Sequence, residues 1–340
     1  MITSDGSRPA SSHSSYPLQA SSTAGLLDDH SWGYQLCITL TRQTPMPVND
    51  KSHGGHESGN TFENIRKHIG MSTESNITYP NYPTKHAEPS LVNPADFLDY
   101  LRRIGQLEDF EVPRCVILCY QHSLYERILA MESIPHPDKT RSYRGLVMLP
   151  RTDHRVGVLG DLGYGAAGAA SALEELIALG VTEFVSIGTA GSLQPALRLG
   201  QVIVCERAIR DEGISHHYLP AAKHAEASPR LSESLRNEFY ARGTTYMAGE
   251  SWTIDAPYRE TVGEARQYRR EGVLCVEMES AAIFAIGKYR SVNVASVFVI
   301  SDSIADQPWQ PQWHRPEIMA ALIAVYDVAA AVLADGSLIH

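Results

Sequence analysis

The chain has 340 residues, of which 43% are hydrophobic and 20% are charged, and its formal net charge is -10. This length accommodates one large α/β domain of about 200 to 250 residues with additional segments. The acidic balance without a basic stripe argues against nucleic-acid binding, and the lack of about 20 consecutive apolar residues argues against a membrane span. We therefore expect a small-molecule partner, with no nucleic acid and no membrane.

The cysteines are odd in number and scattered: Cys37, Cys115, Cys119, Cys205 and Cys275. Most fall in strand-like apolar segments, which indicates buried thiols in a reducing compartment. The N-terminus lacks the apolar core of a secretory signal, so a cytoplasmic location is expected. The spacing from Cys115 to Cys119 has no second Cys/His pair nearby, and no metal site is expected.

Three regions differ in composition. Residues 1–75 are rich in Ser, His, Gly, Asn and Thr, which is typical of a low-complexity or extended N-terminal arm. Residues 76–110 form a lead-in segment with one predicted helix over 94–104, because Asn93 and Pro94 are typical of a helix start. Residues 111–340 have the alternating apolar pattern of an α/β domain.

Strands and helices alternate along this domain. Apolar runs predict strands over 114–120, 146–150, 156–160, 183–188, 201–208, 244–249, 273–276 and 294–301. Helical spacing predicts helices over 123–131, 166–179, 260–270, 280–289 and 316–334. Ser123 with Glu126 is expected to cap the first of these, and Gly180 to end the second. The alternation predicts a mainly parallel three-layer α/β/α sandwich, with ligands beyond the carboxyl ends of the strands.

Two acids flank Met278 at the predicted junction between a strand and a helix. Carboxylates are rarely buried without a partner, so Glu277 and Glu279 are predicted to face a polar ligand such as vicinal hydroxyls. A solvated first helical turn is the alternative. Asp302 ends a second apolar run, and we expect two neighbouring strands to present these acids at one sheet edge.

Two glycine-containing turns are joined by one predicted helix. Gly163 lies in the segment 160–168, where glycines would let the backbone approach a ligand or would allow tight packing of the helix on the sheet. No Lys-Ser/Thr follows, so the segment is not a P-loop. The segment 188–192 is either an anion-binding nest or a structural turn. Together the turns would line one side of a cleft.

Five sequence blocks recur here in a familiar order: 163–165 with 172–176, then 188–194, 200–204, 276–281 and 301–302. With these blocks, the chain from about 112 to 333 resembles the purine/uridine nucleoside phosphorylase family, which also contains nucleosidases. The resemblance implies one α/β domain around a mixed, partly barrel-like sheet. It also implies a homo-oligomer that acts on a nucleoside with phosphate or water and requires no cofactor.

The resemblance also implies roles for the acids. It puts Glu279 on the ribose hydroxyls, Met278 against the sugar and Glu277 in support of the loop, and a carboxylate that accepts two hydroxyl bonds is a strong contact. Asp302 matches the acid that protonates the leaving base in purine-acting members, so a purine is favoured. His86 is the candidate for a histidine that the resemblance places at the 5′ end of the sugar across the subunit interface, with simple surface exposure as its alternative.

The resemblance also assigns residues to the base and to the phosphate. For the base, the resemblance points to Ala190, Gly191, Ser301 and an aromatic ring from Trp252 or Tyr258, although an exposed loop is the alternative for that segment. The phosphate or water site is expected to include Gly163, Gly188, Thr189 and Arg144.

The usual phosphate arginines are replaced by Ser186 and Leu124. A hydroxyl alone does not compensate a phosphate dianion, which arginine forks normally bind. Substitute cations are available in Arg141, Arg144, Arg210 and His122. Three interpretations stay open: a phosphorylase that forms ribose 1-phosphate at a relocated phosphate site, a nucleosidase that uses water, and a member that binds a nucleoside-like ligand for another purpose.

Overall fold

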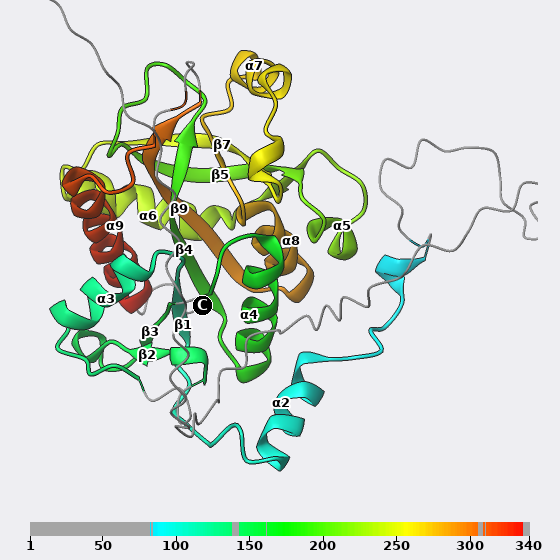
Figure 1. Cartoon of the computed structure of the whole chain (residues 1–340). Helices are drawn as coiled ribbons and strands as arrows, with labels where there is room; N and C mark the ends of the chain where they lie inside the picture. The colour runs from blue at the N-terminus through cyan, green and yellow to red at the C-terminus, as the bar shows by residue number, and fades with distance from the viewer. Residues whose placement is uncertain are drawn as a thin grey trace, which may run out of the picture. The chain divides into compact units, whose positions relative to one another are not determined.

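The computed structural model describes residues 82, 84–137, 143–160, 162–304, 309 and 311–335, and Figure 1 shows the path of the chain. The chain divides into two units, Met1–Met71 and Ser72–His340, and every described residue belongs to the second. The predicted arm over 1–75, together with Cys37 and Arg141, lies outside the described residues.

A nine-stranded mixed sheet organises the described residues. Its strands are β1 (Cys115–Cys119), β2 (Val147–Met148), β3 (Val156–Leu159), β4 (Glu183–Ser192), β5 (Val202–Asp211), β6 (His224–Glu226), β7 (Tyr246–Ile254), β8 (Cys275–Glu277) and β9 (Asn293–Ser303). The order is β2-β3-β1-β4-β8-β7-β5-β6, and β9 pairs with both β4 and β5. The strands β4, β8, β7, β5 and β9 therefore close into a ring, which confirms the barrel-like sheet.

Parallel and antiparallel strand pairs occur in both the open and the closed parts of the sheet. In the open part β1 is parallel to β3 and β4, whereas β2 is antiparallel to β3 and β6 to β5. In the ring β4 with β9, β5 with β7 and β7 with β8 are parallel, and the ring closes with two antiparallel pairs, β4 with β8 and β5 with β9. The expectation of a mainly parallel sheet is therefore wrong, and the sheet is mixed, as the family resemblance implies.

Helices cover the sheet in two layers (Figure 1). One layer contains α2 (Pro94–Arg103), α4 (Ala166–Leu179), α5 (Ser215–Tyr218) and α8 (Ser280–Arg290). The other contains α3 (His122–Met131), α6 (Pro229–Ala241) and α9 (Pro316–Ala334). Each layer buries its own apolar cluster against the strands. A smaller apolar cluster lies under α7 (Val262–Glu271), and short 3-10 helices occur at Lys85–Ala87, Tyr143–Gly145, Pro150–Thr152 and Pro257–Arg259.

The helix α9 is long and apolar enough to cross a membrane by length and composition. In the described structure it packs against α6, β1, β4 and β9, and Val325 and Tyr326 are fully buried there. This is the pattern of a core helix of an α/β domain.

Two details at helix starts differ from the sequence prediction. α3 begins at His122 with Gln121 at the N-cap position, and no side chain caps it, so the predicted capping box at Ser123 is wrong. The helix α6 was not predicted, although Ser228 followed by Pro229 is a typical helix start. The helix α4 has the predicted bounds and ends at Gly180, whose φ is 108°.

Candidate functional site

The strand β4 lies between the two strands that carry the acids. Gly191 of β4 pairs with Val276 of β8 on one side and with Asp302 of β9 on the other. A Cβ atom at Gly191 would lie 3.2 Å from Val276 Cγ1 and 3.3 Å from Asp302 Oδ2, which explains the glycine. The expectation that the acids come from neighbouring strands is therefore wrong, but both acidic segments adjoin the same stretch of β4.

A β-bulge sets the position of Asp302. The register of β9 against β4 jumps from the pair Ala190–Ile300 to the pair Gly191–Asp302, so Ser301 is the extra residue. Such bulges re-aim side chains and are frequent next to active sites. The structure thereby brings Ala190, Gly191, Ser301 and Asp302 together, as the sequence predicted for the base side.

Both oxygens of the buried Asp302 carboxyl accept hydrogen bonds. Ser301 Oγ donates to Oδ1 at 2.8 Å, and the Trp309 indole N–H donates to Oδ2 at 2.7 Å. Glu260 lies half-buried nearby, and burial, followed by the charges of Asp302 and Glu264, raises its pKa to about 7. Glu260 was not predicted as a site residue; its position directly before a helix start gave no such signal.

Glu277 is buried at the end of β8, and its carboxyl is enclosed by protein donors. The backbone N–H groups of Glu279 and Ser280 donate to Oε2 at 2.8 Å each, while the hydroxyls of Ser251 and Thr253 donate to Oε1. Burial raises its pKa, and these hydrogen bonds act in the opposite direction. Glu277 therefore orients the start of α8, and its oxygens are engaged inside the protein rather than offered to a ribose.

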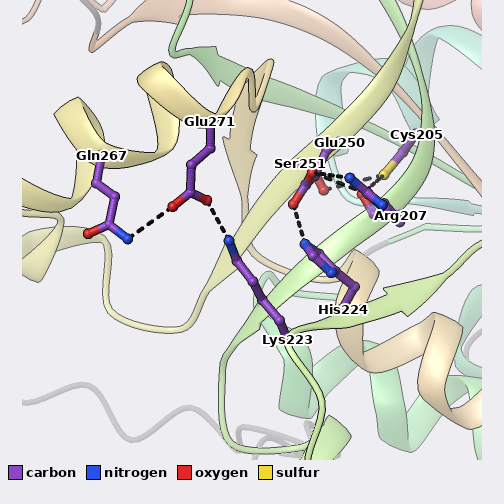
Figure 2. A network of polar contacts seen from close by, with 8 residues as sticks. All are labelled: Cys205, Arg207, Lys223, His224, Glu250, Ser251, Gln267 and Glu271. Atoms are coloured by element: carbon purple, nitrogen blue, oxygen red, sulfur yellow. Dashed lines mark hydrogen bonds and ion pairs between the residues drawn. The ribbon is translucent and has the colours of Figure 1, made fainter.

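Figure 2 shows a polar network that includes residues of β5, β6 and β7 together with Lys223 and two residues of α7. Cys205 Sγ lies 3.3 Å from Ser251 Oγ, which also donates to Glu277. Beside them, Glu250 pairs with both Arg207 and His224. The network fixes the strand β7 from which Ser251 reaches the acid.

Glu279 contacts the first glycine turn. Gly165 has a φ of 95°, and its N–H donates to Glu279 Oε1 at 2.5 Å. The Met278 Cε lies 3.9 Å from the position that a Cβ at Gly165 would occupy. Burial, followed by the charge of Glu277, raises the pKa of Glu279 to about 8. The structure thus joins the turn at Gly163 and Gly165 with Met278 and Glu279.

Asp255 supports this corner of the site, although the sequence did not single it out. Its Oδ1 accepts from the Ala166 N–H at 3.3 Å, and its Oδ2 accepts from the Gly213 N–H at 2.9 Å. The carboxylate therefore ties the start of α4 to the loop before α5. A carboxylate directly after a strand, here β7, is the signal that could have pointed to it.

Four polar side chains form two hydrogen-bonded pairs between the end of β1 and the segment 186–189 of β4: Tyr120, Gln121, Ser186 and Thr189. Gln121 Nε2 donates to Thr189 Oγ1 at 3.0 Å, and Ser186 Oγ donates to Tyr120 Oη at 3.3 Å. Burial, followed by the charge of Glu279, raises the pKa of Tyr120 well above its usual range. We call these four residues the polar cluster; Tyr120 and Gln121, at the carboxyl end of β1, were not predicted as site residues.

The proposed substitute cations lie elsewhere. Arg144 makes a two-pronged ion pair with Glu175 of α4, with contacts of 3.1 and 3.2 Å, so the structure does not bring it to Thr189. Arg210 is buried and donates to Ser215 and to two carbonyl groups around α5. Leu124, at the place of one expected arginine, is fully buried in the core.

The exposed His122 side chain lies 3.9 Å from Glu126 of the same helix. His86 Nε2 makes a 3.0 Å hydrogen bond with the carbonyl group of His216. Within the described part of the chain, no group of three or more His, Cys, Asp or Glu side chains is arranged to hold a metal ion.

The two aromatic candidates for the base differ in solvent exposure. Trp252 is fully buried, donates to Asp211 Oδ2 at 2.9 Å and packs against Tyr268 with ring centroids 5.0 Å apart. Alternate residues of a strand face opposite sides, so Trp252 faces the core while its neighbours Ser251 and Thr253 face Glu277. The expectation that Trp252 stacks on a ligand is therefore wrong. Tyr258 is almost fully exposed.

Comparisons with known proteins find relatives of this chain. A family model described as the Phosphorylase superfamily matches residues 123–334. The uridine phosphorylase of Haemophilus influenzae is 31% identical over 160 residues, which cover 42% of this chain and 63% of that protein. A DeoD-type purine nucleoside phosphorylase of Bacillus cytotoxicus is 31% identical over 155 residues, covering 44% and 64%. The chain thus matches less than two thirds of the length of these two curated relatives.

Solved structures share the fold. The uridine phosphorylase of Vibrio fischeri ES114 superimposes with a TM-score of 0.54 at 24% identity, covering 66% of this chain and 92% of that one. The purine nucleoside phosphorylase of Toxoplasma gondii in complex with immucillin-H gives a TM-score of 0.56 at 20% identity, covering 67% and 92%.

Proposed function

Because the chain belongs to the phosphorylase superfamily, we propose that it is an enzyme that cleaves the N-glycosidic bond of a nucleoside. The observation that carries this proposal is that Gly191 of β4 pairs with Asp302 on one side and with Val276, which precedes the acids at 277 and 279, on the other. A sugar hydroxyl ligand on one side and an acid beside the leaving base on the other are what this cleavage needs.

The sugar is assigned to the corner formed by Gly165, Met278 and Glu279. When the C1′–N bond breaks, the sugar develops positive charge, and buried carboxyl groups nearby stabilise that charge electrostatically. Glu277 contributes by fixing the backbone N–H groups at the start of α8 rather than by contacting the ribose.

A purine is the proposed base. Asp302 is the proton donor in this assignment, and its two hydrogen bonds hold it beside Ala190 and Gly191. Relatives that carry the names of uridine and of purine phosphorylases match this chain equally well, so the choice rests on Asp302. We assign the aromatic contact to Trp309, which is half-exposed beside Asp302, in place of Trp252.

Two activities differ in the molecule that attacks the sugar: phosphate in phosphorolysis and water in hydrolysis. Phosphorolysis to free base and ribose 1-phosphate is the activity that the relatives' names support. Hydrolysis is the second candidate, and the neutral hydrogen-bonding groups of the polar cluster favour it. In both cases the protein is proposed to work in the cytoplasm as a homo-oligomer. The described cysteines are buried and form no disulfide, which supports the cytoplasmic location. Sedimentation velocity tests the oligomeric state.

The experiment compares base release from inosine, guanosine, adenosine and uridine, each with and without inorganic phosphate. We expect release of purine bases and at least about 10-fold slower release of uracil, because general-acid help is typically worth about 10²- to 10⁴-fold. Asp302→Asn should lose most of the purine activity, whereas the exposed Asp109→Asn should not. No base release under either condition, or a preference for uridine, contradicts the proposal.

A further inference from the structure

The helix α2 has an apolar stripe on its exposed side. The stripe consists of Phe97 and Tyr100 of the helix and Ile104 at its C-cap, which are 38%, 48% and 46% exposed. Their spacing places all three on one helix face. Leu91 and Val92, just before the helix, are more exposed still and add apolar surface near its start. Isolated exposed apolar side chains are common on folded proteins, but a continuous stripe marks an interaction surface.

A different face of α2 holds the helix on the domain. Leu98 is buried, and Leu101 packs against the same apolar cluster, which lies under the helix layer that contains α4. The helix α2 contacts α4, and Figure 1 shows α2 at the edge of the structure. The residues that anchor α2 therefore differ from those of the stripe, and the stripe is not needed to attach the helix.

Two charged side chains flank the stripe along one side. Asp96 lies in the first turn of α2 and Arg103 in its last turn, and both are exposed. They are seven residues apart, so they lie in one row beside Tyr100. The Arg103 guanidinium lies over the Tyr100 ring, 6.0 Å from its centroid, which places this row against the stripe. The row is therefore negative at the start of the helix and positive at its end.

This arrangement of charges is complementary to itself. When two copies of α2 pack antiparallel, the first turn of one helix lies against the last turn of the other, so each Asp96 faces the partner subunit's Arg103. In the same arrangement Phe97 meets the partner subunit's Ile104, and the two Tyr100 rings meet near the twofold axis. Self-complementary patches are the pattern of twofold interfaces, and charges beside an apolar seam set the partner and the direction of paired helices.

We propose that the stripe binds a second copy of this chain, with the two α2 helices antiparallel about a twofold axis. The helix lies outside residues 123–334, which match the phosphorylase superfamily, so this contact is additional to any that the matched region makes. A surface of this size belongs to the weak class of interfaces, below about 1,200 Å² in total. The inference does not rest on the proposed function.

The first test exchanges the charges in the full chain. Asp96→Arg and Arg103→Asp each place like charges opposite one another, and we expect self-association in sedimentation velocity to weaken about 10-fold for either variant alone. An equimolar mixture of the two variants should associate as tightly as the wild type, because each substituted position then faces the opposite charge on the other variant. A mixture that associates no more tightly than the single variants overturns the inference.

The second test places a charge in the stripe. Tyr100→Glu would bury a carboxylate in the seam, and we expect self-association to weaken at least about 10-fold. Ala95→Glu makes the same change of charge at an exposed position on the opposite side of α2, and its self-association should stay within about 2-fold of the wild type. Both positions are exposed, so thermal unfolding of both variants should match the wild type. Equal self-association of the two variants overturns the inference.

The third test traps the contact with a disulfide. Tyr100→Cys in a Cys37→Ser background should form a covalent dimer under mild oxidation, because a disulfide needs the two chains in close contact and the described native cysteines are buried. Tyr240→Cys on α6, at a more exposed position, is the control and should remain uncrosslinked. If another macromolecule covers the stripe, Tyr100→Cys stays monomeric on a non-reducing gel, and this result overturns the inference. Base release enters none of these measurements, so a failure of the proposed function is distinguishable.

Discussion

The indole N–H of Trp309 donates a 2.7 Å hydrogen bond to Oδ2 of Asp302. The ring of Trp309 also packs edge-on against Trp313, with centroids 5.6 Å apart. The side chain that holds the proposed acid is therefore itself held by a second aromatic residue in the segment after β9.

Replacing Trp309 by Phe removes this hydrogen bond and keeps an aromatic ring. We expect kcat for inosine to fall about 10-fold, because loss of a hydrogen bond that positions the acid costs about 0.5 to 1.5 kcal/mol. Trp313→Phe preserves the bond to Asp302 and should retain most of the activity. Steady-state kinetics on both variants make the comparison, and equal activities would show that Asp302 does not depend on Trp309.

Adding a methyl group at Gly191 should separate the two acidic segments. In Gly191→Ala the new Cβ lies within 3.3 Å of both Val276 and Asp302, so we expect a loss of about 1 to 3 kcal/mol of stability. Base release should fall at least about 10-fold, because the acid is displaced. Gly263→Ala, at an open position of α7, is the control in urea denaturation and in the assay. A Gly191→Ala variant as active as the control would contradict this packing.

The structural position of Glu277 predicts a stability defect. In Glu277→Gln one side-chain oxygen becomes an amide that faces hydrogen-bond donors, such as the Ser280 N–H, and we expect a loss of about 2 to 4 kcal/mol. Glu233→Gln on the exposed side of α6 is the control, and urea denaturation gives both values. If Glu277→Gln were as stable as the control and only its KM rose, Glu277 would be a ribose ligand after all.

Glu279 predicts a pH dependence of stability. Its pKa rises from 4.5 to about 8 on folding, so the folded chain binds the proton more tightly than the unfolded chain. Its contribution is therefore fully present below about pH 4.5 and is lost as the pH rises through about 8. Glu279→Gln lacks this titration and should gain stability relative to the wild type over that range, by on the order of a few kcal/mol.

The measurement is urea denaturation of both proteins from pH 5 to 9. The difference between them isolates Glu279 from other acids with raised pKa values, such as Glu260. A constant difference across the range would refute the raised pKa. In the assay, Glu279→Gln should raise KM for inosine, because the amide has only one oxygen to accept hydrogen bonds from the ribose hydroxyls.

Much of the fold could be predicted from local patterns. The helix α4 is an uninterrupted Ala- and Leu-rich run that ends at a glycine, and α9 begins at Pro316 as expected. The reversed direction of β8 could not be predicted, since a strand of three residues carries no signal of its neighbour's direction. Family resemblance supplied the barrel-like sheet, which periodicity alone did not.

Some residues of the candidate site could likewise be predicted from the sequence, and others could not. The place of Glu279 and Asp302 at the sheet edge could be predicted, because both come at the ends of apolar runs that form strands. The face of β7 on which Trp252 lies could not, because it depends on how side chains alternate along that strand in the folded sheet. The partner of Arg144 is Glu175, 31 residues away, and only tertiary packing brings them together. Gln121 carried no motif, and its hydrogen bond to Thr189, 68 residues away, comes only from tertiary packing.

The strand β4 belongs to both the open part of the sheet and the closed ring, and this has an evolutionary consequence. Gln121 and Tyr120 follow β1 of the open part, whereas Met278, Glu279 and Asp302 belong to strands and turns of the ring. Exchange of the short segment after β1 would therefore change the side chains that contact Ser186 and Thr189 without disturbing the pairing of β8 and β9 with β4. The two parts of the candidate site can thus vary separately in sequence.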